Sequence, residues 1–381
     1  MSGAVPARQR VNPSRTVKAP VRRIPWPWRD RAGRFSWFKV AVLVLEIEPA
    51  LYVAFALATD RLGARPLTEA THQTGLWAIR FLMISLLASP ARAIFNWQRL
   101  VSIRRQLGLT ALFYTVAHVA LYSWDQKWKM PTVAVELLTR SYLQIGLVAL
   151  VGIALLAVTS TDKALRALGS GWKRLHRIAY LAGVLSLLHY FLQSKADVSE
   201  ATLMAGLFIW MMGWRLMPTG PDREPLPILA LGAASALLAA LVEYIWYFLA
   251  TKVDPLKVLR AETDLGYGPH AAGQVFLVCL CMAIATGLFW AYQRERLRLS
   301  PWYDIALYVG GSTIVACVLY AFNLTDPWLP EEIPVWQAAA ALLVIGACCG
   351  LLRSVLPARQ RIFDAVCVAA MLLPLFAGLA A

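Results

Sequence analysis

Three histidines stand in or beside long apolar runs of this sequence, where ionisable side chains are rare. His118 lies in TALFYTVAHVALY, and His176 and His189 lie in WKRLHRIAYLAGVLSLLHY. An ionisable residue at membrane depth is costly, so one that faces the interior of a helix bundle indicates a function. Imidazole is a common axial ligand of haem iron, and two facing helices can each supply one. These residue types therefore favour a haem site inside a membrane bundle.

The elements that must position these histidines are membrane helices. The chain has 381 residues, of which 59% are hydrophobic and only 15% are charged, too apolar for one soluble core. A hydrocarbon layer of about 30 Å needs roughly 20 apolar residues per helix. The sequence predicts an all-α polytopic membrane protein with about eleven spans, at 37–58, 73–90, 107–125, 142–160, 176–194, 200–217, 227–250, 271–292, 303–322, 334–352 and 362–380.

The net charge of +15 does not indicate nucleic-acid binding, because the basic residues form no single soluble patch. They cluster before the first span and after the even-numbered spans, as at Arg104 and Arg105 and at Lys173 and Arg174. The loop NLTDPWLPEEIP after the ninth span is acidic instead. The positive-inside rule therefore predicts a cytoplasmic N-terminus and, with eleven spans, an external C-terminus.

The chain divides into three predicted regions. Residues 1–36 are rich in Arg and Pro and predict a disordered, basic cytoplasmic tail. The stretch PTGPDREPLP breaks the helices at 218–227, which separates a six-helix region at 37–217 from a five-helix extension of unknown role at 227–381. No convincing internal repeat is visible. There is no GxGxxG or Walker A motif, so a reductant must come from a partner or a lipid-soluble carrier.

Helix geometry brings two of the histidines to similar depths. His118 lies 11 residues into a span that runs outward, about 16 Å deep at ~1.5 Å per residue. His189 follows His176 by 13 residues in the fifth span, about 20 Å deep on the same rise. We therefore expect one haem between the third and fifth spans, in the outer half of the membrane, with His118 and His189 as its axial ligands.

Two further histidines have open roles. His176 lies near the inner surface, about 140° around the fifth span from His189, where it could ligate a second haem, help to hold a quinone or flavin, or be neutral to function. His72, in THQTGLW at the predicted outer surface, is either structural or borders a docking or quinone site.

The region from about His72 to Leu216 resembles the MsrQ family, haem-binding membrane subunits of a periplasmic methionine-sulfoxide reductase system within the ferric-reductase-like superfamily. The resemblance rests on HQTGLWAIRFL, LASPAR, RRQLGLTALFYTVAHVALY, LLTRSYLQIGLVAL, LAVTST and WKRLHRIAYLAGVLSLLHY. It implies one or two b-type haems bound by His118, His176 and His189, an FMN in some members, and electron delivery to MsrP, a periplasmic molybdopterin reductase. The five-helix extension departs from the family pattern of about six helices.

Arg140, in LLTRSYLQIG at the predicted outer end of a helix, is a candidate for contact with a haem propionate or the partner, because guanidinium pairs bidentately with carboxylates. Arg99, Arg104 and Arg105 fit the orientation signal and could also pair with propionates or an acidic flavin reductase.

The sequence thus favours an electron-transfer subunit of the bacterial inner membrane rather than a catalytic subunit. Electrons would pass from quinol or a cytoplasmic flavin reductase, through haem, to the periplasmic reductase. One alternative is a ferric or cupric reductase of the same superfamily. Another is a transporter or scaffold with incidental histidines, which predicts a colourless protein that still functions after His118→Ala.

Overall fold

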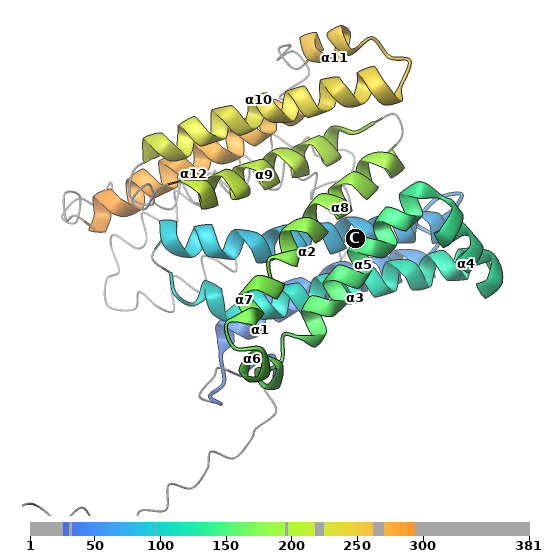
Figure 1. Cartoon of the computed structure of the whole chain (residues 1–381), viewed down its shortest axis with the longest axis horizontal. Helices are drawn as coiled ribbons and strands as arrows, with labels where there is room; N and C mark the ends of the chain where they lie inside the picture. Colours follow the sequence, from blue (N-terminus) through green and yellow to red (C-terminus); the bar gives the residue numbers. More distant parts are fainter. Residues whose placement is uncertain are drawn as a thin grey trace, which may run out of the picture. The chain divides into compact units, whose positions relative to one another are not determined.

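A computed structural model of the chain describes residues 26–29, 33–95, 97–194, 197–217, 225–261 and 270–293, without the side chains of 288–293 (Figure 1). Within these ranges the regular structure is helical, apart from one isolated bridge between Arg29 and Phe35. The predicted all-α class is confirmed for this part of the chain. The last three predicted spans, at 303–322, 334–352 and 362–380, lie outside the described residues.

Six helices in the described part are long and apolar enough to cross a membrane, which makes the chain a multi-pass membrane protein. These are α1 (Trp37–Ala58), α2 (Pro66–Ile94), α3 (Leu100–Asp125), α5 (Ser141–Val158), the Gly171–Ser194 segment and α10 (Pro225–Ala250). The predicted bounds agree with α1 and nearly with α5 and α10, whereas α2 and α3 begin about two turns earlier than their apolar runs suggest.

The described residues before Leu45, at 26–29 and 33–44, belong to a compact unit of their own. The end of the predicted disordered tail is folded there: Trp26 and Trp28 stack with ring centroids 4.9 Å apart, and the Lys39 ammonium donates to the carbonyl oxygen of Arg29 at 3.1 Å. Most of the predicted tail lies outside the described residues.

The second unit begins at Leu45 and contains the histidines. Within it α2 packs along α3, which carries His118, and α5 packs along α8 (Ile178–Ser194), which carries His189. Helix α8 covers the predicted span 176–194 except for its first two residues. A short helix α7 (Gly171–Leu175) ends at His176, and α8 begins two residues later.

Short helices connect the long ones. They are α4 (Met130–Thr139), α6 (Asp162–Leu168) and α11 (Pro255–Ala261). The sequence reasoning missed all three because none contains an apolar run of spanning length. Helix α4 packs against the beginning of α5 (Figure 1).

Helix α9 (Ser199–Leu216) is deeply buried, with Trp210, Met204 and Leu203 all at most 2% exposed. It packs against α2 and α8 and also against α10 and α12 (Ala271–Gln293), which run alongside each other in Figure 1. Small residues allow the close approach: a Cβ on Gly206 would lie 2.5 Å from Val275. Helices on both sides of the predicted boundary at 218–227 thus share one core cluster, and the division at that boundary stays a prediction.

Helix α1 contains Pro49, which cannot donate a backbone hydrogen bond to the preceding turn. The neighbouring helix α3 supplies polar partners there. The hydroxyl of Tyr114 donates to the backbone carbonyl of Glu46 at 2.8 Å, and the Gln106 amide donates to the Glu46 carboxylate at 2.8 Å.

Candidate functional site

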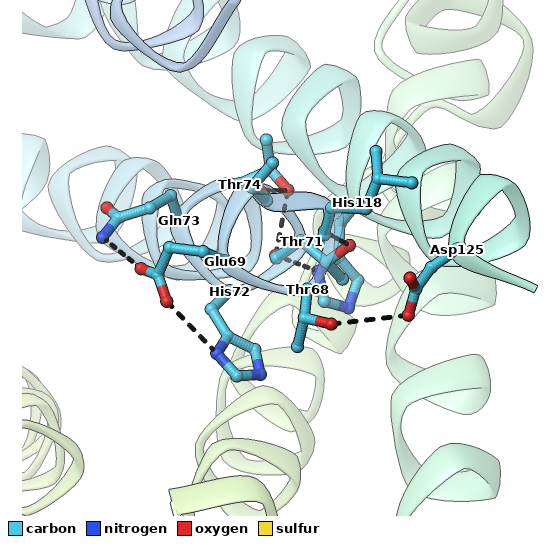
Figure 2. A network of polar contacts seen from close by, with 10 residues as sticks. Thr68, Glu69, Thr71, His72, Gln73, Thr74, His118 and Asp125 are labelled. Carbon is cyan, nitrogen blue, oxygen red and sulfur yellow. Dashed lines mark hydrogen bonds and ion pairs between the residues drawn. The ribbon is translucent and has the colours of Figure 1, made fainter. Parts of the chain in front are cut away.

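His118 is held by the helix that precedes its own. Its Nδ1 atom lies 2.7 Å from the backbone carbonyl oxygen of Thr71 on α2. One turn further along α2, Gly75 leaves room for the ring, because a Cβ there would lie 2.8 Å from Nδ1 and 3.0 Å from Cε1 of His118. Figure 2 shows this ring against the Thr71 backbone.

His189 is held in the same manner. Its Nδ1 atom lies 2.8 Å from the backbone carbonyl oxygen of Tyr142 on α5. One turn along α5, a Cβ on Gly146 would lie 2.9 Å from Nδ1 and 3.0 Å from Cε1 of the ring. A carbonyl and a glycine on the neighbouring helix therefore fix the position of each histidine.

The two arrangements repeat at a constant spacing. Tyr142 follows Thr71, Gly146 follows Gly75 and His189 follows His118, each time by 71 residues. The surrounding segments, LTEATHQTGLWA and LTRSYLQIGLVA, agree at six of twelve positions. No internal repeat was expected from the sequence, but the structure corrects this: α2–α3 and α5–α8 are two helical hairpins with equivalent histidines.

The hydrogen bonds also fix the tautomer of both rings. A carbonyl oxygen only accepts, so each Nδ1 must carry the proton and donate it. The neutral imidazole then presents the Nε2 lone pair, which is the state a metal ligand needs. The two rings lie opposite each other, with centroids 6.3 Å apart and planes at 88°. The structure thus brings together the two histidines that the depth argument paired.

Both histidines line a cavity of about 560 Å³, a size typical of cofactor sites, which run from about 300 to 1,000 Å³. Its walls come from α2, α3, α5 and α8, with contributions from α4 and α9. The wall is largely apolar, formed by residues such as Leu76, Ile79, Leu82, Leu143, Leu147, Leu150 and Ile153.

Polar side chains also line the cavity, and several form the network in Figure 2. The Gln73 amide donates to Glu69 at 3.0 Å, and the Thr68 hydroxyl lies 3.5 Å from the carboxylate of Asp125. His72, for which the sequence allows a structural role or a place at the border of a site, lines the cavity; its side chain is 57% exposed and its Nδ1 lies 3.9 Å from Glu69.

His176 lies elsewhere. It caps α7, its ring stacks on Trp172 with centroids 3.8 Å apart, and its Nε2 lies 3.3 Å from the hydroxyl of Thr159. It does not line the cavity of His118 and His189. The expected rotation of about 140° assumed a continuous helix and does not apply, because the helix is interrupted at this residue.

Arg140 joins α4 to α5 and does not line the cavity. Its guanidinium pairs with Glu136 at 2.8 Å and donates to the hydroxyl of Tyr142 at 3.2 Å, and Tyr122 donates to the same Glu136 carboxylate. The hydrogen bond to Tyr142 and the nearby carboxylate raise the pKa of Arg140, so its charge is secure. Tyr122 and Tyr142 line the cavity, which places Arg140 one side chain away from it.

Sequence reasoning missed the residues that hold the histidines. Thr71 and Tyr142 act through backbone carbonyls, and Gly75 and Gly146 act through the side chain they lack. None of these has a chemical signature in a single sequence. The shared spacing of 71 residues was the signal that could have found all four.

Comparison with known proteins matches residues 74–187 to a family described as "Ferric reductase like transmembrane component". That range contains His118 and His176 and ends two residues before His189. No solved structure matches the chain significantly.

Several relatives carry the name "Protein-methionine-sulfoxide reductase heme-binding subunit MsrQ". The protein of Rhodospirillum rubrum is 38% identical over 192 residues, which is 50% of this chain and 90% of the relative. That of Azospira oryzae is 34% identical over 187 residues, 48% of this chain and 80% of the relative. A Xanthomonas campestris protein is 38% identical over 159 residues, 42% of this chain and 73% of the relative. About half of the chain thus has no counterpart in these alignments.

Proposed function

Since the chain belongs to the MsrQ family, we propose that it is a haem-binding electron-transfer subunit that serves a periplasmic methionine-sulfoxide reductase. In this proposal His118 and His189 would hold a b-type haem within the cavity between the two helical hairpins. The observation that carries it is the matched pair of imidazoles, each fixed through Nδ1 and each free to offer Nε2.

The cavity fits this cofactor in three respects. The imidazole centroids of His118 and His189 lie 6.3 Å apart, so both rings could ligate one metal ion. The cavity wall is mainly apolar, as a porphyrin requires. In the described part of the chain no group of three or more His, Cys, Asp or Glu could hold a metal ion alone, whereas two imidazoles suffice for iron with four porphyrin nitrogens.

Bound haem supplies a one-electron couple at a fixed place in the membrane. The residues of this chain determine the properties of that couple. The carbonyls of Thr71 and Tyr142 accept from Nδ1, which orients the rings and raises the basicity of Nε2. Gly75 and Gly146 keep the rings close to the neighbouring helices, and the apolar wall limits access of water.

The reaction of the partner determines how many electrons this chain must deliver for each repaired residue. Reduction of one methionine sulfoxide to methionine and water takes two electrons and two protons, so a one-electron carrier must turn over twice for each repair. The oxygen-atom chemistry belongs to the MsrP-like molybdopterin reductase, and this chain conducts electrons. Their source is quinol or a cytoplasmic flavin reductase, since the sequence contains no nucleotide-binding motif. FMN, a bound quinone and a second haem at His176 belong to the same proposal as additional carriers.

The positive-inside pattern supports an orientation with the N-terminus in the cytoplasm of a bacterial inner membrane. In that orientation α4 and the polar network of Figure 2 lie at the periplasmic end of the cavity. His72 and Arg140, both exposed there, are then candidates for contact with the periplasmic partner.

The proposal is tested with the purified chain in phospholipid vesicles, prereduced and then mixed with the periplasmic reductase and a protein that contains methionine sulfoxide. With a small, substoichiometric amount of the reductase, we expect full haem oxidation only when the sulfoxide is also present, because the sulfoxide is the final electron acceptor. His118→Ala and His189→Ala should abolish the signal, whereas His72→Ala should retain the haem. A haem that stays reduced in the complete mixture would contradict the proposed partner.

A further inference from the structure

Arg80 is a buried cation in the middle of a membrane helix. It lies 14 residues from either end of α2 and is 7% exposed. Among the described residues it is the only lysine or arginine in the buried set. A buried guanidinium at this depth is costly, so its retention calls for a specific partner and indicates a function.

The partner of Arg80 is Glu200 at the beginning of α9. The guanidinium Nη2 lies 2.6 Å from Oε1 of Glu200, and the hydroxyl of Tyr190 on α8 donates to the other carboxylate oxygen at 2.9 Å. The guanidinium also lies over the ring of Trp77, 4.8 Å from its centroid. These contacts join α2, α8 and α9 by one charged network.

This network reaches the cavity of the two histidines. Glu200 and Tyr190 line the cavity, and Tyr190 directly follows His189 in the chain. Arg80 itself lies behind the lining, although its neighbour Ile79 belongs to it. The lining includes three carboxylates, those of Asp125, Asp197 and Glu200, and no lysine or arginine. Arg80 therefore compensates negative charge at the cavity wall from outside it.

We propose that Arg80, acting through Glu200 and Tyr190, sets the reduction potential of the haem held between His118 and His189. This inference rests on the proposed function. Arg80 is a positioning residue, since it touches Glu200 rather than the cofactor site. Ferric haem carries one positive charge more than ferrous haem, so a nearby carboxylate favours the ferric state and a guanidinium favours the ferrous state. In a low-dielectric interior these effects are much larger than in water.

Opposite charge changes should therefore shift the potential in opposite directions. Arg80→Gln leaves the Glu200 carboxylate without its compensating charge, and we expect a more negative midpoint potential. Glu200→Gln leaves the guanidinium uncompensated, and we expect a more positive one. The double variant removes both charges and should lie between the single variants, which isolates the coupling between the two residues.

The measurement is a spectroelectrochemical titration of the purified full-length chain in detergent or nanodiscs. Arg80→Lys keeps the charge and should stay close to the wild-type potential. Asp162→Asn is the matched control, because it removes a carboxylate from the exposed pair with Arg105, and it should leave the potential unchanged. If one single variant does not accumulate, comparison of the other with the double variant still decides the question, because the double variant removes both charges and leaves neither unpaired.

The two proposals fail separately in this experiment. Wild-type protein without haem would overturn the proposed function. Haem-loaded variants whose potentials equal that of the wild type, or shift in the same direction for Arg80→Gln and Glu200→Gln, would overturn the role of Arg80 and leave the haem site standing.

Discussion

His118 and His189 face each other with ring centroids 6.3 Å apart, although 71 residues separate them in the chain. Each is anchored by a carbonyl that precedes it by 47 residues. The site therefore consists of two equivalent halves, one from each helical hairpin. A substitution can be made in either half separately.

Gly75 and Gly146 should be as important for haem binding as the backbone carbonyls that accept hydrogen bonds from the two histidines. In Gly146→Ala the new Cβ would lie 2.9 Å from Nδ1 of His189, so the ring must move and its bond to Tyr142 must weaken. Overpacking of this kind costs about 1–3 kcal/mol. We expect purified Gly146→Ala, and equally Gly75→Ala, to contain much less haem per protein by the pyridine haemochromogen assay.

Gly152→Ala is the control for Gly146→Ala, since it lies on the same helix and its Cβ would make an ordinary contact with Ile178 at 3.5 Å. It should retain wild-type haem content. Equal haem loss in both variants would mean that α5 simply tolerates no added side chain, and the proposed fit of ring against glycine would be wrong.

His176 should be dispensable for the haem between the hairpins. Its ring is stacked on Trp172 and its Nε2 lies near Thr159, away from the cavity. We expect His176→Ala to keep the reduced spectrum and potential of that haem. The haem-to-protein ratio tests the second-haem proposal in the same sample: a fall to half of the wild-type ratio would identify His176 as a ligand of another haem.

The contact between α1 and α3 should contribute modestly to stability. Tyr114→Phe removes the hydroxyl that donates to the Glu46 carbonyl beside Pro49. Interhelical side-chain hydrogen bonds in membranes average about 0.6 kcal/mol and reach about 1.7 kcal/mol. We expect a loss of that size in the free energy of unfolding, measured by denaturant titration in mixed micelles, with an unchanged haem spectrum. An unchanged free energy would show that the bond contributes nothing.

Arg140 offers a test of the exposed end of the site. Arg140→Ala breaks the contacts with Glu136 and Tyr142 but leaves the cavity lining intact, so haem content should stay the same. If Arg140 meets the partner, electron transfer to the periplasmic reductase should slow most at low salt. Lys163→Gln, a charge change in a predicted cytoplasmic loop, should have no such effect. Haem loss in Arg140→Ala would instead favour a propionate contact.

Much of the architecture could be predicted because lipid imposes strict rules on sequence. The apolar runs at 37–58 and 227–250 correspond closely to α1 and α10, and equal depth correctly paired His118 with His189. These rules do not predict helices that lack an apolar run long enough to span the membrane. Helix α4 contains only 10 residues, and the interruption at His176 falls inside a sequence that looks continuous.

The contacts that position His118 and His189 were harder to predict than the two histidines themselves. Arg80 and Glu200 are 120 residues apart, and a buried ion pair between distant helices leaves no local pattern. Backbone carbonyls, as at Thr71 and Tyr142, leave none either. The 71-residue repeat was present in the sequence, but only a few positions retain it, and the structure was needed to identify which ones matter.

The most direct test of the haem site is a dithionite-reduced minus oxidised absorption spectrum of the purified wild-type chain, His118→Ala, His189→Ala and the control His72→Ala. We predict a b-type haem signal in the wild type and in His72→Ala, and its loss in both ligand variants. Well-folded wild-type protein without haem after expression with ample haem, or a full signal in either ligand variant, would contradict the account.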